Sequence, residues 1–363
     1  MPFASKDPEP GSASKHPDIG TVATPIRPGF VMESGRCLLV PILIALIILC
    51  LATLSSFLVG AGDVTPSRAL AALFGAADEE AHFVVFELRM VRTLLGVTVG
   101  IALGAAGSLL QAATRNPLAE PGLLGVSAGA SFAVVVAISL GSSAAGLHIW
   151  VAVAGALGGC LLVLLVSQVR GVGDDPVRLV LAGAAFSSML MAMTTLLLLF
   201  DQRTADEIRF WIIGALGGRS AEILSWTAPM ILCSLIVMLV LVRPLASLAL
   251  GEKIATGLGH NPRLTRLLTL IVVAFLVGAA TAAAGPIAFI GLIVPFAARA
   301  LVGTDIRRVL WMAVLLGPSL VLVADVLSRL AVRPYELPIG VITAIIGAPV
   351  LVAVVRSQRM PSL

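Results

Sequence analysis

The stretch TLLGVTVGIALGAAGSLLQAA occupies residues 93–113 and contains no charged side chain. A helix needs about 20 apolar residues to cross about 30 Å of hydrocarbon, and backbone polar groups inside lipid must be paired within the segment. Gly96, Gly100 and Gly104 recur every fourth residue, with Gly107 close to the same face. Small residues at this spacing let two helix backbones approach closely. The stretch therefore predicts a transmembrane helix packed tightly in a bundle, and Gly122, Gly125 and Gly129 repeat the pattern in the next segment.

The composition of the whole chain agrees with this assignment. Of the 363 residues, 58% are hydrophobic and 12% are charged, whereas a soluble domain carries roughly 25% charged residues. The chain is therefore predicted to be an all-α polytopic membrane protein. The net charge of +4 is interpreted as a basic excess on cytoplasmic loops, and not as a nucleic-acid surface. The four cysteines (Cys37, Cys50, Cys160 and Cys233) stand singly and are interpreted as small core residues.

Apolar runs divide the chain into three parts. Residues 1–36, rich in Pro, Gly and Ser, are predicted to be a disordered cytosolic extension. Residues 37–357 form the membrane domain, and residues 358–363 form a cytosolic tail. Ten spans are predicted: 37–59, 93–113, 120–141, 147–168, 177–200, 225–243, 265–284, 286–302, 309–328 and 337–355. A shorter apolar stretch, RFWIIGALGG at 209–218, is predicted to be an interfacial or re-entrant helix.

Ten spans place both termini on one side, and the basic residues indicate which side. With both ends in the cytosol, 16 of the 24 Lys and Arg residues fall in inner segments, as the positive-inside rule requires. Eight arginines still fall outside and need an explanation: Arg68, Arg89, Arg92, Arg203, Arg209, Arg219, Arg329 and Arg333.

The cytosolic loop after the sixth span reads ALGEKIATGLG, residues 249–259. Leu250, Ile254 and Leu258 recur at i, i+4 and i+8 and form one apolar stripe of a short helix. Gly259 is placed to end the helix before Asn261-Pro262. The spacing alone leaves two interpretations open: the stripe packs on the protein's own bundle, or it fits a groove on a cytosolic partner.

Several blocks of the sequence resemble FecCD-type (BtuC-like) permeases, the membrane subunits of ABC importers for iron-siderophores, haem and vitamin B12. The blocks are LRMVRTLLGVTVGIALGAAGSLLQAATRNPLAEPGLLGVSAGAS (88–131), PVRLVLAGAA (176–185), LALGEKIATGLG (248–259), GPIAFIGLIVPFAARALVG (285–303) and ELPIGVITAIIGAPVL (336–351). TRNPLAEPGLLG and RFWIIGAL look closest to ferric-siderophore members. The resemblance covers residues 88–351 and leaves the N-terminal extension without a counterpart.

The resemblance implies three functional sets of residues. The loop would be the coupling helix that rests in a cleft of the ATPase, through Leu250, Gly251, Glu252, Ile254, Ala255, Leu258 and Gly259. The outer arginines that would meet acidic residues of a substrate-binding protein are Arg89, Arg92 and Arg329. The cytoplasmic gate would lie at Asp175, Pro176 and Val177.

Each set has an alternative or a departure from the family pattern. Any outer arginine is also explained by interfacial snorkelling, and Arg329 by an internal pair with Asp325 at i−4. Asp175 differs from the small hydroxyl residues that the family carries at its gate. Phe296 stands where many relatives carry His, which argues against an essential titrating group there.

Catalysis by this polypeptide is not expected. No G-x-x-x-x-G-K-[ST] motif occurs, and the four histidines are scattered without metal-ligand spacing. No cofactor and no metal site are therefore predicted. A membrane-embedded enzyme would need clustered polar residues at one depth, which are not found. An ion-coupled secondary transporter would need intramembrane acids, and Asp325 is the only acid well within a predicted span.

The resemblance therefore predicts the permease of an ABC importer in the bacterial inner membrane, carrying iron-siderophores, with haem or vitamin B12 left open. The expected partners are a cytosolic ATPase dimer, a second permease subunit that is identical or related, a periplasmic or lipid-anchored binding protein, and membrane lipid.

Overall fold

The computed structural model describes residues 38–60, 64–75, 78–142, 145–167, 176–209, 211–332 and 335–356. The predicted extension 1–36, the predicted tail 358–363, and the individual residues Asp175, Phe210 and Arg333 lie outside the described residues. Within the described ranges the chain is helical and no strand is assigned, as predicted for an all-α protein.

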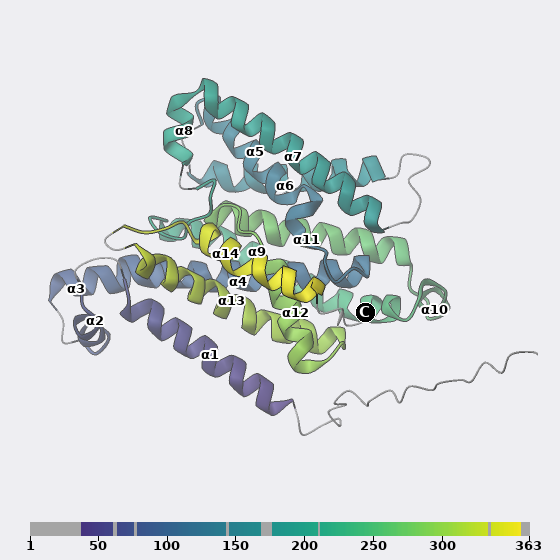
Figure 1. The fold of residues 1–363 in the computed structure, drawn as a ribbon, viewed down its shortest axis with the longest axis horizontal. Helices are drawn as coiled ribbons and strands as arrows, with labels where there is room; N and C mark the ends of the chain where they lie inside the picture. Colours follow the sequence, from purple (N-terminus) through teal and green to yellow (C-terminus); the bar gives the residue numbers. More distant parts are fainter. Residues whose placement is uncertain are drawn as a thin grey trace, which may run out of the picture. The chain divides into compact units, whose positions relative to one another are not determined.

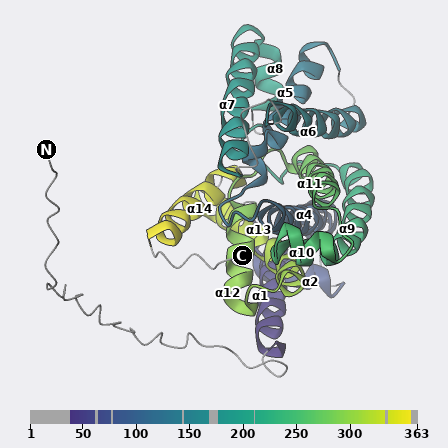
Figure 2. The ribbon, with the colours of Figure 1, turned by 90° about the vertical axis from the view of Figure 1, so that its right-hand side faces the viewer.

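The helices follow one another along the chain with short connections (Figures 1 and 2). The α-helices are α1 (Leu39–Leu58), α2 (Pro66–Leu73), α3 (Glu79–Phe83), α4 (Met90–Thr114), α5 (Val126–Ser139), α6 (Ala145–Ser167), α7 (Pro176–Phe200), α8 (Gln202–Ile208), α9 (Ala221–Ala249), α10 (Glu252–Gly257), α11 (Pro262–Ala284), α12 (Ile290–Val302), α13 (Ile306–Ala331) and α14 (Ile339–Arg356). A π-helical turn, Val84–Arg89, joins α3 to α4, and a 3₁₀ turn, Pro121–Leu124, precedes α5.

Six of the described helices are long and apolar enough to cross a bilayer, and four shorter apolar helices accompany them. Together they correspond to the ten predicted spans, although the number of crossings stays a prediction. Several predicted boundaries are wrong, among them those of the sixth span, predicted as 225–243, whereas α9 runs from Ala221 to Ala249. The span predicted to start at residue 120 starts at Val126, because Pro121 begins a 3₁₀ turn. The span predicted to start at residue 286 starts at Ile290, after a non-helical break at 285–289.

The interfacial or re-entrant helix predicted at 209–218 is also wrong as a helix, because residues 211–218 form a non-helical turn that enters the protein. Trp211 is 9% exposed. The Ala215 N–H donates to the Ala284 carbonyl at 2.8 Å, and the Gly340 N–H donates to the Gly214 carbonyl at 3.5 Å. The turn therefore packs against the end of α11 and the start of α14.

Helix α4 lies at the centre of the bundle, where it contacts α9, α11, α12 and α13. Its glycine stripe explains this position. A Cβ atom added at Gly100 would overlap the backbone of Pro318, one at Gly104 would lie 2.7 Å from the Ala313 carbonyl oxygen, and one at Gly107 would overlap the backbone of Gly291. The interpretation of these glycines as sites of tight packing is confirmed.

The second glycine pattern is only partly confirmed. Gly125 and Gly129 approach Gly159 and Gly155 of α6, whereas Gly122 lies in the 3₁₀ turn with nothing within 4 Å of an added Cβ. Gly122 therefore does not belong to a helix-packing face.

The short helices mark the two ends of the bundle. Helices α2, α3 and α8 lie at one end and α10 lies at the other (Figure 1). Successive spans cross the membrane in opposite directions. The loops after the first and fifth spans, which carry α2, α3 and α8, should therefore lie at the end opposite the loop after the sixth span, which carries α10. We call the end that carries α10 the coupling end and the other the outer end.

Substitution of Gly100 tests the close packing of α4 on α13. Because the Pro318 backbone cannot move aside as a flexible side chain would, Gly100→Ala should lower the free energy of unfolding by about 1–3 kcal/mol, and Gly100→Leu should prevent stable insertion. Thermal unfolding in detergent measures the effect.

Gly158→Ala in α6 is the matched control, since nothing lies within 4 Å of an added Cβ there. It should be neutral or slightly stabilising, because alanine favours a helix over glycine. Equal melting temperatures for Gly100→Ala and Gly158→Ala would contradict the packing argument.

Candidate functional site

The 249–259 loop presents three large apolar side chains at the coupling end. Leu250 is 66% exposed, Ile254 50% and Leu258 61%. We call these three residues the coupling face. The same small helix buries Ala255, which is 1% exposed, towards the bundle. The loop therefore differs from an ordinary amphipathic surface segment, because its large apolar residues face outwards and a small one faces inwards.

The helix is shorter than predicted, and Gly251 is the reason. Helix α10 covers only Glu252–Gly257, and Leu250 belongs to the end of α9. Gly251 has φ 124° and ψ 150°, a conformation that is essentially restricted to glycine. Nothing lies within 4 Å of an added Cβ at this position, so backbone conformation and not space requires the glycine. The sharp turn fixes the direction of α10 relative to α9.

The far end of α10 is fixed by hydrogen bonds. The His260 N–H donates to the Ala255 carbonyl at 2.9 Å, and the Gly259 N–H donates to the Thr256 carbonyl at 3.0 Å. This pair of bonds, with Gly259 at φ 82°, is a Schellman motif that satisfies the last carbonyls of a helix. Asn261 then caps α11, since its side-chain oxygen accepts the N–H groups of Arg263 and Leu264.

Glu252 contributes an ion pair within the protein. Its carboxylate lies 2.5 Å from the Arg266 guanidinium of α11, and both side chains are partly exposed. An exposed pair contributes little to stability, but this one joins the start of α10 to the next helix. A shallow hollow beside it is lined by polar residues that include Lys253, Thr256 and Arg263. The predicted coupling residues thus lie together on one firmly held loop.

The three arginines expected to dock a binding protein lie at the outer end, where they bond within the protein. Arg89 is 5% exposed, and its guanidinium donates to the carbonyls of Phe57, Leu58 and Val64 at 2.8, 3.0 and 3.2 Å. Arg329 is 1% exposed, and it donates to the Ser56 and Val59 carbonyls at 3.0 and 2.7 Å. Both arginines therefore cap the C-terminal end of α1, whose last carbonyls have no partner within the helix.

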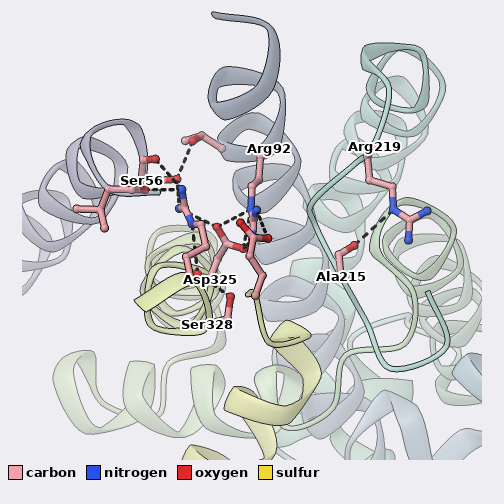
Figure 3. Close-up of polar contacts among 10 residues, drawn as sticks. Ser56, Arg92, Ala215, Arg219, Asp325 and Ser328 are labelled. Carbon is pink, nitrogen blue, oxygen red and sulfur yellow. Dashed lines mark hydrogen bonds and ion pairs between the residues drawn. The ribbon is translucent and has the colours of Figure 1, made fainter. Parts of the chain in front are cut away.

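Asp325 neutralises this cluster from its centre (Figure 3). Its carboxylate is 0% exposed and lies 2.8 Å from Arg329, the i+4 pair that the spacing allowed. It also accepts three hydrogen bonds of 2.8–3.1 Å from Arg92 of α4. The Arg92 Nη1 group lies 2.7 Å from the Glu336 carboxylate, which precedes α14. One buried carboxylate thus joins α4 to α13, and its two arginines extend the network to α1 and to the segment before α14.

The structure therefore places Arg89 and Arg329 inside the protein and not on the outward-facing docking surface expected for them. The physical reason is the cost of leaving the carbonyls of α1 without partners at the edge of the membrane. Arg92, with its side chain 13% exposed, is the only one of the three that approaches the surface.

Other outer arginines also have partners. Arg68 lies 2.8 Å from Glu80 and contacts Asp78, and its hydrogen bond lowers the pKa of the Asp78 carboxyl. Arg209 pairs with Asp206 at 2.9 Å. Arg219 donates to the Ala215 carbonyl at 3.5 Å (Figure 3), and burial lowers its pKa. Local ion pairs and carbonyl contacts therefore account for several arginines that the charge count left unexplained.

Of the three residues expected at the gate, Asp175 lies outside the residues that the structure describes. Pro176 and Val177 are the first residues of α7. No group of three or more His, Cys, Asp or Glu that suits a metal ion occurs in the described ranges.

The sequence reasoning missed two sets of polar contacts. In the RNPLAEPG segment, Arg115 bonds to the Leu248 carbonyl and Glu120 accepts the Phe289 N–H. The sequence reasoning also missed the capping of α1 by distant arginines. The absence of any basic residue in the last turn of α1 was the available signal, since helix ends in a membrane still need partners.

Comparison with known proteins agrees with this architecture. The chain is 43% identical to the ferric enterobactin transport system permease protein FepD of Escherichia coli K12, over 89% of this chain and 96% of that protein. It is 37% identical to the probable siderophore transport system permease protein YfiZ of Bacillus subtilis 168, over 76% and 83%.

A solved structure of a metal-chelate type ABC transporter in an inward-facing conformation superposes with a TM-score of 0.76 at 28% identity, covering 87% of this chain and 98% of that one. The model of the FecCD transport family matches residues 45–357. This chain is thus a multi-pass membrane protein that belongs to the FecCD transport family.

Proposed function

We propose that this chain is the membrane-spanning permease of an ABC importer that carries ferric siderophores into the cytoplasm, driven by a separate ATPase that docks on the coupling face. The cargo is inferred from the names of the relatives, which include a ferric enterobactin permease and an iron(3+)-hydroxamate permease. These names favour ferric chelates over haem or vitamin B12.

The single observation that carries the proposal is the exposure of the coupling face on a firmly held loop. Leu250, Ile254 and Leu258 are each at least half exposed, although polar residues such as Glu252, Lys253 and Thr256 belong to the same loop. Full burial of one such side chain contributes about 1.5–3 kcal/mol. A cleft on a partner that covers all three therefore gains substantial binding free energy, and a lipid-facing role does not explain the polar neighbours.

The anchoring of the loop supports a role in coupling and not only in attachment. The turn at Gly251, the ion pair of Glu252 and the Schellman motif at Gly259 hold α10 to both α9 and α11. A displacement of the ATPase surface would therefore move these two helices, instead of being absorbed by a flexible loop.

A second permease subunit would complete the pathway against α7. Within an apolar stretch of 18 residues, 17% of the residues of α7 are buried, compared with 78% in the apolar stretch of the continuous helix that contains α4. Helix α7 also lies at the edge of the bundle beside α5 and α6 (Figures 1 and 2). The gate predicted at Asp175, Pro176 and Val177 would lie at the start of this helix.

A substrate-binding protein would deliver the chelate at the outer end. Of the three arginines expected to meet it, Arg92 has the most suitable position, because its side chain is partly exposed and one of its partners, Glu336, is 37% exposed. Exposed charges of this kind direct encounter and register more than they add affinity.

The network around Asp325 argues against ion-coupled transport. A proton or ion relay requires a carboxylate that can exchange its partner. Both oxygens of Asp325 are bonded to arginines of two helices, and its side chain is 0% exposed. The geometry favours a structural charge cluster.

The coupling face is tested by capture of the purified ATPase on the permease in detergent. Ile254→Asp and Leu258→Asp should each weaken binding about 30-fold, which corresponds to about 2 kcal/mol for an anchor residue, and should abolish ATP-driven uptake. Phe74→Asp is the matched control, because Phe74 is 80% exposed but lies between α2 and α3 at the outer end.

Glu252→Arg should be assayed separately from the two leucine and isoleucine variants. Reversal of this charge also breaks the internal ion pair with Arg266, so a loss of binding would have two explanations. Normal ATPase capture and normal uptake by the Ile254→Asp, Leu258→Asp double variant would refute the assignment of the coupling face.

Asp325→Asn tests the alternative mechanism. Removing this charge leaves Arg92 and Arg329 without their shared counter-ion, so the free energy of unfolding should fall by about 3–5 kcal/mol. Asp206→Asn, which breaks the exposed pair with Arg209, should change it by no more than about 1 kcal/mol.

Thermal unfolding and the amount of inserted protein provide the measurement. An Asp325→Asn variant that is as stable as the parent, but has lost a proton-gradient dependence of uptake shown by the parent, would instead support ion coupling.

A further inference from the structure

Among the described residues, two non-glycine residues have a positive φ angle, Arg115 at 50° and Phe289 at 69°. L-residues adopt this conformation rarely, and it persists only where surrounding contacts impose it. Both residues belong to one set of contacts. Arg115 begins a short segment, residues 115–120, and Glu120 at its other end contacts Phe289. We call residues 115–120 the bridge.

At one end the bridge holds the turn that starts the coupling loop. The Arg115 guanidinium donates to the carbonyl oxygen of Leu248, in the last turn of α9. The same oxygen accepts the Gly251 N–H at 3.1 Å, which closes the turn before α10. A cation at the C-terminal carbonyls of a helix is favourable both as a donor and through the helix dipole. Arg115, which directly follows α4, is therefore bonded to the same carbonyl that closes the turn before α10.

At the other end the bridge holds the start of α12. The Glu120 carboxylate accepts the N–H of Phe289, the residue that caps α12. The Gln111 side chain of α4 supports this contact, because its amide donates to the Ala119 carbonyl at 3.2 Å. The Phe289 ring lies so close to α14 that a Cβ added at Gly347 would overlap it. A change at Glu120 would therefore reach both α12 and α14.

The bridge itself is stiff. The Asn116 side-chain oxygen accepts the Leu118 N–H at 2.9 Å, and the Ala119 N–H donates to the Asn116 carbonyl at 3.1 Å. Pro117 fixes its own φ angle and restricts Asn116. Pro117 and Leu118 also line a narrow groove with Phe296 of α12 and Val350 of α14. A stiff segment bonded at both ends passes on a displacement instead of absorbing it.

From these contacts we propose that the bridge transmits movement of the coupling loop to α12 and α14, with Arg115 as the positioning residue that connects them. The proposal rests on the proposed function, since it assigns a path to the force that an ATPase would apply at the coupling face. Arg115 acts through the Leu248 carbonyl and needs no contact with the ATPase or the cargo.

The test separates attachment of the ATPase from its coupling to transport. In the reconstituted complex of permease, ATPase and binding protein, Arg115→Gln should bind the ATPase as the parent does and keep its basal ATP hydrolysis. Uptake, and the stimulation of hydrolysis by loaded binding protein, should fall at least about tenfold. Arg115→Lys should recover part of both, because an ammonium group still donates to a carbonyl. Arg243→Gln, an exposed arginine of α9 near the same end, should have no effect.

A second readout follows the movement directly. A cysteine at Val350, in a chain whose four native cysteines are replaced by alanine, should react with a maleimide at a rate that changes when a non-hydrolysable ATP analogue is added. Arg115→Gln should abolish this change. Glu120→Ala, which breaks the other end of the bridge, should also abolish the change. If Arg115→Gln does not insert into the membrane, Glu120→Ala alone tests the proposal.

The outcomes are distinct. Normal coupled uptake, or an unchanged nucleotide response at position 350, in the bridge variants would overturn the proposal. Loss of ATPase capture by Arg115→Gln would also overturn it, because Arg115 would then act in attachment. If the Ile254→Asp, Leu258→Asp variant captures the ATPase normally, the proposed function fails, whatever the bridge variants show.

Discussion

Within hydrocarbon no water is present to bond a free carbonyl or to solvate a charge, so every polar group has to find its partner in the protein. This constraint explains why the charged residues of the membrane domain join helices that are distant in sequence. Asp325 lies 233 positions from Arg92, and Arg329 lies 273 positions from Ser56. Each bond gives a partner to a charged or polar group that is shielded from water, and it fixes the position of one helix relative to another.

The same constraint operates at the coupling end, with different consequences. There Arg115 adds a further donor to the Leu248 carbonyl in the last turn of α9, and Glu120 accepts the Phe289 N–H at the start of α12. Between the two ends, α4 is held by close glycine contacts with α13 and α12. Polar bonds at both ends and apolar packing in the middle make α4 the helix through which the other parts of the bundle are connected.

The sequence predicts what depends on local pattern. Helical class follows from the apolar runs, and the packing face of α4 follows from Gly100 and Gly104 because their spacing matches the helical period. The common face of Ile254 and Leu258 follows from the amphipathic stripe, but the stripe does not tell whether the bundle or a partner covers that face. The resemblance to a known family, and not the spacing, favoured the partner.

The remaining features depend on contacts that no local pattern encodes. The positions of Arg89 and Arg329 at the end opposite α10 follow from the order of the spans, but their burial depends on the final position of α1, whose own sequence offers no basic cap. The boundaries at Val126 and Ile290 were misplaced because hydropathy does not distinguish a helix from an apolar non-helical break such as 285–289. Such breaks are tolerated where protein surrounds them.

The division between the two ends also bears on how one fold serves different chelates. At the outer end, Arg89, Arg92 and Arg329 bond to other helices and hold them together. Few charges there are therefore free to recognise cargo. The coupling face is, by contrast, an apolar surface held in place by Gly251 and by the ion pair of Glu252 with Arg266. In the proposed importer a binding protein would recognise the cargo and force would be applied at one anchored loop, so that neither end of the bundle would need specificity. The bundle would need stiffness between its ends, and the left-handed residues Arg115 and Phe289 lie where that stiffness is concentrated.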